Sequence, residues 1–334
     1  MLILLWQAED FPYSTRFLNN FRRCGRSGIL LPAVSLGLWK NFGDETPYAE
    51  SRTMVHYAFD HGITHYDLAN NYGPPPGSAE TTMGRIIEES LRPYRDELFI
   101  ATKAGYEMWP GPYGNWGSRK SLTASLDQSL RRMKLDYVDL FYTHRYDPET
   151  PIEETLQALV DIVRSGKALY IGISRWPAEA TRKALRYLKE HDTPCLAYQG
   201  RLNLIDRSMQ QSGLTDLLRK EDVGFVSFSP LAQGLLTDRY LEGVPKDSRM
   251  ALNTSLRRDI LTCELTDRLR RLNDFAREAG RTIAQTALSW VLAEGATSVI
   301  VGVSRLEQLK EDIATASMPP LTFDELETIQ EILG

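Results

Sequence analysis

The chain has 334 residues, and its length and composition already exclude several classes of protein. Hydrophobic residues make up 42% and charged residues 25%, which is typical of a globular protein with a sizeable core and excludes a disordered chain. The net charge of -5 disfavours a protein that coats nucleic acid. The three cysteines, Cys24, Cys195 and Cys263, form no disulfide or zinc-binding pattern, so we expect a reducing, cytoplasmic compartment.

The first twenty residues precede the regular pattern of the chain. Residues 1–6 are apolar, but they lack the basic start and the small-residue cleavage site of a signal peptide. No apolar run approaches the ~18 residues that a membrane span needs, so we expect no membrane association. We therefore predict that residues 1–20 are an N-terminal extension and that residues 21–334 form one domain.

Eight short apolar runs, rich in β-forming residues, recur along the chain, and a helical pattern follows most of them. They span residues 34–39, 63–66, 98–102, 137–142, 168–173, 195–198, 224–228 and 298–301. Near-continuous apolar runs are typical of parallel strands that are covered on both faces. Strands that alternate with helices indicate βαβ units.

The helical segments show apolar stripes and start signals. Leu122, Leu126, Leu130 and Met133 recur at helical spacing, which indicates a face packed against a core. The segment 150–153, TPIE, predicts a capping box at the start of another helix.

Eight βα units without a linker predict a single closed (β/α)8 TIM barrel. A doubly wound open sheet is the alternative, but it would usually carry a glycine-rich phosphate loop after its first strand, and residues 37–41 contain none. The long gap before the last strand predicts an inserted loop over residues 233–261 and a helix over 266–280. Residues 21–31 are expected to form a hairpin that closes the bottom of the barrel.

Four polar residues follow or end predicted strands, at the rim where barrel enzymes carry their active sites. They are Asp67, Tyr72, Lys103 and His144. The Tyr72 phenol is a weak acid, so we expect the Lys103 ammonium to lower its pKa and Asp67 to keep that ammonium charged. His144 is expected to donate a hydrogen bond to a carbonyl oxygen.

The segment 62–73, GITHYDLANNYG, followed by Glu80 and Gly84, resembles the signature of the aldo-keto reductases. Three further segments, 36–43 (LGLWKNFG), 72–80 (YGPPPGSAE) and 103–114 (KAGYEMWPGPYG), resemble the bacterial L-glyceraldehyde 3-phosphate reductases within that family. The potassium-channel β subunits are similar but more distant, and they typically have Asn at the position of His144. The resemblance implies that Asp67, Tyr72, Lys103 and His144 are the catalytic tetrad.

The resemblance also implies a nicotinamide cofactor, NADP(H), bound over the barrel mouth without a Rossmann motif. The residues at matching positions are Trp39, Asp67, Ser174, Arg175, Gln199, Phe228, Ser229, Pro230, Leu231, Ala232, Gln233, Gly234, Arg239, Arg249, Gly302, Ser304, Arg305, Gln308, Glu311 and Asp312. Relatives usually have Asn at the position of Asp312, and a carboxylate there could accept from the adenine amine but could not donate.

Residues 304–307, SRLE, predict a capping box that opens a helix after the last strand. A helix N-terminus attracts anions, and the planar guanidinium of Arg305 is suited to a phosphate. With the resemblance, this segment predicts binding of the adenosine 2′-phosphate.

The predicted function is NADPH-dependent reduction of short aldehydes, namely L-glyceraldehyde 3-phosphate and also methylglyoxal. Four aromatic residues and one methionine of the loop after the third strand are expected to wall a small pocket: Tyr106, Met108, Trp109, Tyr113 and Trp116. Arg145, Arg119 and Lys120 are expected to supply charge for a phosphorylated aldehyde.

Two other functions are weighed against this one. The first is an NADP-bound regulatory subunit with slow chemistry, which His144 disfavours. The second is a metal-dependent hydrolase, which would need a cluster of His, Asp or Glu ligands at the strand ends. It is disfavoured because only His144 of the five histidines lies at a suitable place, and we expect no metal. Relatives form tetramers or octamers, so a homo-oligomer is expected.

Overall fold

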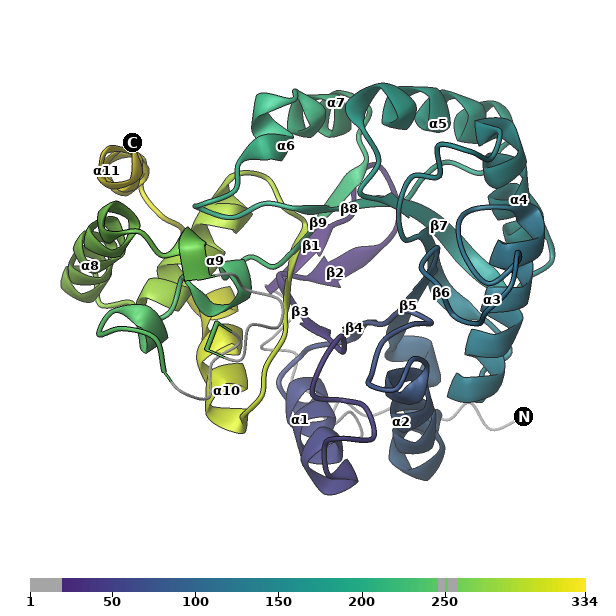
Figure 1. Cartoon of the computed structure of the whole chain (residues 1–334), viewed down its shortest axis with the longest axis horizontal. Coiled ribbons are helices and arrows are strands. Elements are labelled where there is room, and N and C mark those ends of the chain that lie inside the picture. The colour runs from purple at the N-terminus through teal and green to yellow at the C-terminus, as the bar shows by residue number, and fades with distance from the viewer. Residues whose placement is uncertain (1–19, 246–249, 252–257) are drawn as a thin grey trace, which may run out of the picture.

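The computed structural model describes residues 20–245, 250–251 and 258–334, so the predicted extension over residues 1–20 lies outside it apart from Asn20. Eight parallel strands close into one barrel in the order β10-β3-β4-β5-β6-β7-β8-β9 (Figure 1). The strands are β3 (Val34–Gly37), β4 (His65–Asp67), β5 (Phe99–Ala104), β6 (Val138–Thr143), β7 (Ala168–Ser174), β8 (Ala197–Arg201), β9 (Gly224–Phe228) and β10 (Ser298–Val301). The predicted (β/α)8 barrel is confirmed.

Backbone pairing continues past the last apolar residue of several predicted strands. β5 runs to Ala104 and includes Lys103, while β7 and β8 include Ser174 and Gln199. The register pairs Lys103 with Tyr142 and Ser174 with Gln199. The strands extend past the apolar runs because ladder hydrogen bonds join backbone groups and do not require an apolar side chain. These polar side chains are therefore carried by rigid strands.

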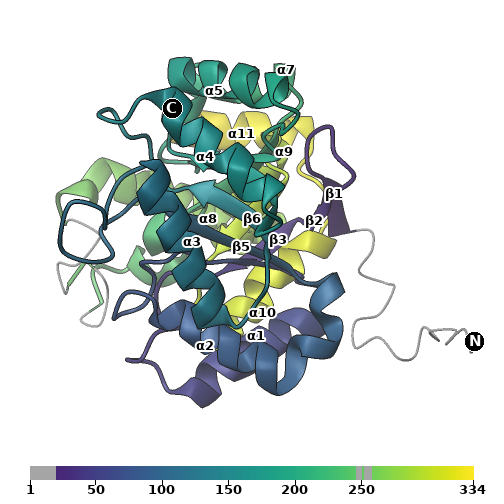
Figure 2. The same cartoon turned by 90° about the vertical axis from the view of Figure 1, so that its right-hand side faces the viewer.

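Helices cover the outside of the barrel (Figures 1 and 2). They are α1 (Tyr48–Asp60), α2 (Ser78–Ile86), α3 (Arg119–Met133), α4 (Ile152–Arg164), α5 (Ala178–Glu190), α6 (Ser208–Gln211), α7 (Leu214–Lys220), α8 (Cys263–Glu278), α9 (Ile283–Ala293), α10 (Leu306–Ala314) and α11 (Phe323–Leu333). A π-helical turn (Ile87–Leu91) and a 3₁₀ turn (Arg92–Glu97) follow α2, and α8 is the helix predicted over residues 266–280.

The two predicted capping boxes are wrong. Before α4, Thr150 Oγ1 donates to Asp147 Oδ2 at 2.7 Å and does not cap the helix. The capping position of α10 is Arg305, while Ser304 Oγ donates to Gln308 Oε1 at 3.0 Å. Hydroxyl side chains readily bond to other acceptors near a helix start, and here they do so.

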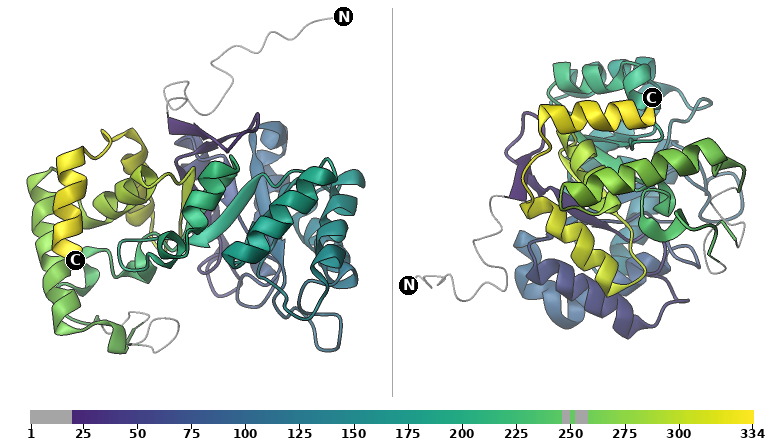
Figure 3. Two further views of the ribbon diagram at one scale, coloured as in Figure 1. Left: turned by 90° about the horizontal axis from the view of Figure 1, so that it is seen from above. Right: turned by 90° about the vertical axis from the view of Figure 1, so that its left-hand side faces the viewer.

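A two-stranded hairpin closes the N-terminal end of the barrel, as predicted. β1 (Phe21–Arg23) pairs antiparallel with β2 (Leu30–Pro32), at one end of the barrel in Figure 3 (left). Cys24 and Leu31 are fully buried, and Cys24 Sγ lies 3.5 Å from the carbonyl oxygen of Leu196, just before β8. The barrel residues in their cluster include Ala101, Leu140, Tyr142 and Val226. A ligand would therefore enter from the opposite end.

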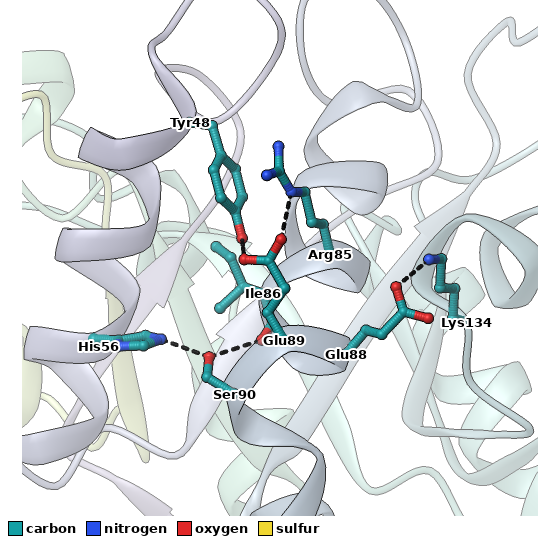
Figure 4. A network of polar contacts seen from close by, with 8 residues as sticks. All are labelled: Tyr48, His56, Arg85, Ile86, Glu88, Glu89, Ser90 and Lys134. Atoms are coloured by element: carbon teal, nitrogen blue, oxygen red, sulfur yellow. Dashed lines mark hydrogen bonds and ion pairs between the residues drawn. The ribbon is translucent and has the colours of Figure 1, made fainter.

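A polar network ties α1 to the π-helical turn after α2 (Figure 4). His56 Nε2 lies 2.7 Å from Ser90 Oγ, which donates to the Ile86 carbonyl oxygen at 2.9 Å. Tyr48 donates to Glu89 Oε2 at 2.6 Å, and burial together with this bond raises the pKa of Tyr48 to about 12. None of these residues lines the cavity described below, so the network holds the outer wall of the barrel.

The described part of the chain has neither a helix that could span a membrane nor a disulfide bond. Within it, no helix has the length and apolar character needed to cross a membrane. Cys24 and Cys195 are buried thiols, Cys263 is an exposed one, and none of them is bonded to another cysteine.

Candidate active site

A cavity of about 1160 Å³ opens at the C-terminal ends of the strands. Strand-end residues form its floor: Asp67 of β4, Ser174 of β7, Gln199 of β8, Phe228 of β9 and Val301 of β10. The 3₁₀ turns Ala232–Gly234 and Asp238–Tyr240 and the start of α10 contribute residues to the walls. The cavity therefore lies where a barrel of this type carries its chemistry.

A buried ion pair lies under this floor. Lys103 is 0% exposed, and its Nζ donates to Asp67 Oδ2 at 2.7 Å and to the Leu68 carbonyl oxygen at 2.6 Å. The same Nζ lies 3.4 Å from the Tyr72 hydroxyl oxygen. Gln199 Nε2 donates to the other carboxylate oxygen of Asp67 at 2.8 Å. Tyr72 and Asp67 line the cavity and Lys103 supports them from behind.

Glu80 supports the strand that carries Lys103. Glu80 is fully buried and accepts from Thr102 Oγ1 at 2.5 Å and from Arg132 Nε at 2.7 Å. Thr102 directly precedes Lys103, so this network joins α2, β5 and α3 immediately beside the lysine. Burial lowers the pKa of Lys103, and the carboxylates of Asp67 and Glu80 oppose this shift and favour the ammonium.

The expected lowering of the Tyr72 pKa is wrong. Burial and then the negative charge of Asp67 raise the pKa of Tyr72 well above its ordinary value. The Lys103 ammonium does not reverse this shift, because the Asp67 carboxylate at 2.7 Å largely cancels its charge. Tyr72 therefore carries its proton at neutral pH, and the ammonium at 3.4 Å stabilises the phenolate once that proton has left.

His144 lines the cavity as a neutral imidazole. Burial, followed by the positive charges of Lys103, Arg175 and Arg145, lowers the pKa of His144 well below its ordinary value. Its ring lies edge-on to Tyr72, with centroids 5.6 Å apart, and Nδ1 is buried without a partner in the described structure. A neutral imidazole has one N–H, so His144 can donate one hydrogen bond to a ligand in the cavity.

The wall predicted from the loop after the third strand is largely wrong. Of its five residues, only Tyr106 lines the cavity, and its ring meets His144 edge-on with centroids 4.7 Å apart. Arg175 Nη1 donates to the Tyr106 hydroxyl oxygen at 3.0 Å. Trp116 instead stacks on Arg145, whose Cζ lies 3.5 Å from the ring centroid. The loop folds on itself, which its aromatic composition does not reveal.

The basic groups predicted for a phosphorylated aldehyde are also engaged elsewhere. Arg145 donates to the Gly105 carbonyl oxygen at 2.9 Å, and Arg119 pairs with Asp161. Lys120 lies 4.9 Å from the ring centroid of Tyr113, and none of the three basic residues lines the cavity. The basic side chains that do line it are Lys40, Arg175, Arg201, Arg239 and Arg305. Lys40 and Arg201 were missed, although both lie just after or at the end of a strand.

Nearly all of the predicted cofactor residues line this single cavity. Ala232 does not line it, and Arg249 lies outside the described residues. The loop after β9 has positive φ at three residues other than glycine, Ser229 (52°), Ala232 (46°) and Gln233 (59°). Such strain is typical of loops shaped for a ligand. Asn203 Nδ2 holds the loop by donating to the Ser229 carbonyl oxygen at 3.0 Å.

The polar atoms of the floor fit a nicotinamide. Ser174 Oγ is buried and has no hydrogen-bond partner in the described structure. Gln199 uses its amide nitrogen on Asp67, which leaves its oxygen as an acceptor. The carboxamide of a nicotinamide supplies the matching donors and acceptor. The ring of Phe228 offers an aromatic face for the nicotinamide ring. Arg175 and Arg201 lie within 6 Å of the centroid of the Phe228 ring.

The far end of the cavity fits a phosphate. Arg305 lines the cavity at the first position before α10, and Gln308 and Glu307 line it from the first turn. The free N–H groups of that turn and the Arg305 guanidinium together favour an anion. No group of three or more His, Cys, Asp or Glu side chains that could hold a metal ion occurs among the residues described.

Comparisons with known proteins show the family of the chain. Residues 33–334 match the family model for the aldo/keto reductase family. The chain is 50% identical over 333 residues to L-glyceraldehyde 3-phosphate reductase of Escherichia coli O157:H7, which covers 98% of this chain and 95% of that protein. It is 33% identical over 321 residues to a probable voltage-gated potassium channel subunit beta of Arabidopsis thaliana. That alignment covers 94% of this chain and 96% of that protein.

A solved structure shows the same fold. The aldo-keto reductase of Bacillus halodurans in its holo form matches with a TM-score of 0.76 at 24% identity, over 94% of this chain and 96% of that one. The resemblance inferred from the motifs is confirmed. This chain therefore belongs to the aldo/keto reductase family and is an oxidoreductase.

Proposed function

We propose that this oxidoreductase uses NADP(H) to reduce short aldehydes to alcohols, with L-glyceraldehyde 3-phosphate as principal substrate and methylglyoxal as a second one. The observation that carries the proposal is the Tyr72 hydroxyl, which faces the cavity 3.4 Å from the buried Lys103 ammonium. The 50% identity to a reductase of that phosphorylated aldehyde supports the substrate. A cytoplasmic location is part of the proposal and is supported by the three free thiols.

Each residue of the tetrad has one task. When bound, the nicotinamide would supply the hydride that reduces the carbonyl carbon. Tyr72 donates its proton to the carbonyl oxygen, and the Lys103 ammonium stabilises the phenolate that remains. Asp67 holds Lys103 charged and in place through the 2.7 Å ion pair. The neutral His144 donates a hydrogen bond to the same carbonyl oxygen and orients it.

The basic lining of the cavity supports a phosphorylated substrate. Arg175 and Arg201 flank Phe228, and Lys40 lies over Trp39 at the rim, 4.8 Å from its ring centroid. Guanidinium and ammonium groups bind phosphate through charge-assisted hydrogen bonds.

Steady-state kinetics with a panel of aldehydes tests the proposal. We expect NADPH consumption with L-glyceraldehyde 3-phosphate at a higher kcat/KM than with methylglyoxal, and only weak turnover of bulky aromatic ketones. A protein that binds NADPH but turns over none of the short aldehydes would instead fit the regulatory function suggested by the channel subunits, to which the identity is 33%.

Cofactor selectivity gives a second test, on Arg305. We expect Arg305→Ala to weaken NADPH binding by about 1.5–3 kcal/mol, because a charge-assisted phosphate contact is lost. NADH lacks that phosphate, so its affinity should change little. Fluorescence titration of both cofactors measures the difference, with Arg305→Lys as the control that keeps the charge. Equal weakening of NADPH binding and NADH binding would show that Arg305 does not bind the 2′-phosphate.

A further inference from the structure

The first turn of α2 holds Tyr72 through the backbone. The carbonyl oxygen of Tyr72 accepts from the N–H group of Gly77 at 3.0 Å and from that of Ala79 at 3.3 Å. Gly77 precedes the helix with a positive φ of 91°, so the chain turns sharply from the loop of Tyr72 into α2. The backbone of the proposed proton donor is therefore fixed to the start of this helix.

Glu80, in the same turn of α2, holds the strand that carries Lys103. Glu80 and Thr102 are both 0% exposed, and Glu80 Oε1 accepts from Thr102 Oγ1 at 2.5 Å. Successive side chains of a strand point to opposite faces, so Thr102 faces the helices while Lys103 faces the barrel interior. One carboxylate thus connects the helix that positions Tyr72 with the strand that positions Lys103.

Helix α3 fixes Glu80 from the other side. Arg132 Nε donates to Glu80 Oε2 at 2.7 Å, so both oxygens of the carboxylate are bonded. α2 and α3 approach closely here (Figure 2), since a Cβ atom at Gly84 would lie 2.4 Å from the Arg132 carbonyl oxygen. Glu80 does not line the cavity, so any effect that it has on the reaction must act through other residues.

We propose that Glu80 is a positioning residue for aldehyde reduction, which fixes the separation of Tyr72 and Lys103 by joining the two elements that carry them. The separation concerned is the 3.4 Å between the Tyr72 hydroxyl oxygen and Lys103 Nζ. The inference rests on the proposed function, because the two residues have their tasks only in that reaction. Misplacement of a reacting group by about 1 Å can slow a reaction about 10²-fold, so a loosened network should slow the chemistry and leave cofactor binding nearly unchanged.

The first test is Glu80→Gln, which keeps the size of the side chain. The amide nitrogen of glutamine donates and cannot accept, so the side chain can no longer accept from both Arg132 and Thr102. We expect single-turnover reduction of L-glyceraldehyde 3-phosphate by the NADPH complex to slow about tenfold, with the Kd of NADPH within about threefold of wild type. The solvent deuterium isotope effect on that rate should increase, because proton transfer from Tyr72 limits the reaction more strongly.

The second test removes the other partner of the bond. Thr102→Val deletes the hydroxyl and leaves Glu80 in place, so it should slow the single-turnover rate to a similar extent. Thr102→Ser keeps a hydroxyl at this position and should restore the rate to within about twofold of wild type. This pair decides the question alone if Glu80→Gln does not fold.

Asp139→Asn is the matched control, because Asp139 is a second buried carboxylate that bonds to β5 and pairs with an arginine. It accepts from the Ile100 N–H at 2.8 Å and from Arg95 at 2.9 Å, and Ile100 lies nearer the start of the strand than Thr102 does. Asp139→Asn should lower the free energy of unfolding, as Glu80→Gln does, but should keep the wild-type single-turnover rate and isotope effect. Chemical denaturation measures the stability of each variant.

Two results would overturn the inference. One is a wild-type single-turnover rate and isotope effect in Thr102→Val, and the other is an equal loss of rate in Asp139→Asn. Either would show that Glu80 only stabilises the fold. Failure of the proposed function is distinguishable from both, because wild type itself would then bind NADPH without reducing the short aldehydes.

Discussion

Tyr72→Phe should lower kcat for aldehyde reduction by about 10²–10⁴-fold, the range that a positioned general acid contributes. The substitution removes only the hydroxyl that lies 3.4 Å from Lys103 Nζ. The phenyl ring keeps the edge-on contact with His144, so the cavity should keep its shape. Cofactor affinity, measured first by fluorescence titration, should stay within about threefold of wild type, after which single-turnover reduction gives the rate.

Tyr106→Phe is the matched control, because it removes a hydroxyl from a second tyrosine of the same cavity. That hydroxyl accepts from Arg175, so we expect a loss smaller than tenfold, consistent with one polar contact at about 1 kcal/mol. Near-normal reduction by Tyr72→Phe, or equal losses in the two variants, would show that Tyr72 is not the proton donor.

The barrel was predictable from sequence because its signals are local and repeated. Each strand is an apolar run, and each carboxyl end meets the same rim, so the positions of Asp67, Tyr72, Lys103 and His144 along the chain predict that they converge. In the structure Asp67, Tyr72 and His144 line the cavity, and Lys103 lies directly behind them. The register of β5 against β6 determines this position of Lys103.

The errors arise where the outcome depends on contacts distant in sequence. The pKa of Tyr72 is raised by burial and then by the negative charge of Asp67, and neither effect is visible in the spacing of residues. The guanidinium of Arg145 is chemically suited to bind a phosphate. It instead stacks on Trp116, which lies in the loop of an earlier βα unit. Arg201 was missed because a lone arginine at a strand end has no motif around it.

The second large effect is expected for Lys103→Met. Methionine has a similar length but no charge, so Asp67 would be left buried without its counter-ion. Removing one partner of a buried pair typically costs about 3–5 kcal/mol, and we expect a loss of this size in the free energy of unfolding. Reduction should also slow by at least about 10²-fold, because the phenolate of Tyr72 loses the ammonium that stabilises it. Chemical denaturation and single-turnover kinetics measure the two losses separately.

The double variant Asp67→Asn/Lys103→Met separates the structural task of the pair from its chemical task. It replaces the ion pair by two neutral side chains, and Gln199 Nε2, which donates to Asp67 Oδ1 in the wild type, can donate to the amide oxygen of the new side chain. Neutral replacement of a buried pair is often tolerated, so most of the stability should return. Activity should not return, because the cation beside Tyr72 has been removed. Recovery of both would mean that Lys103 serves only to neutralise Asp67, and recovery of neither would mean that the pair is needed for the barrel floor to form.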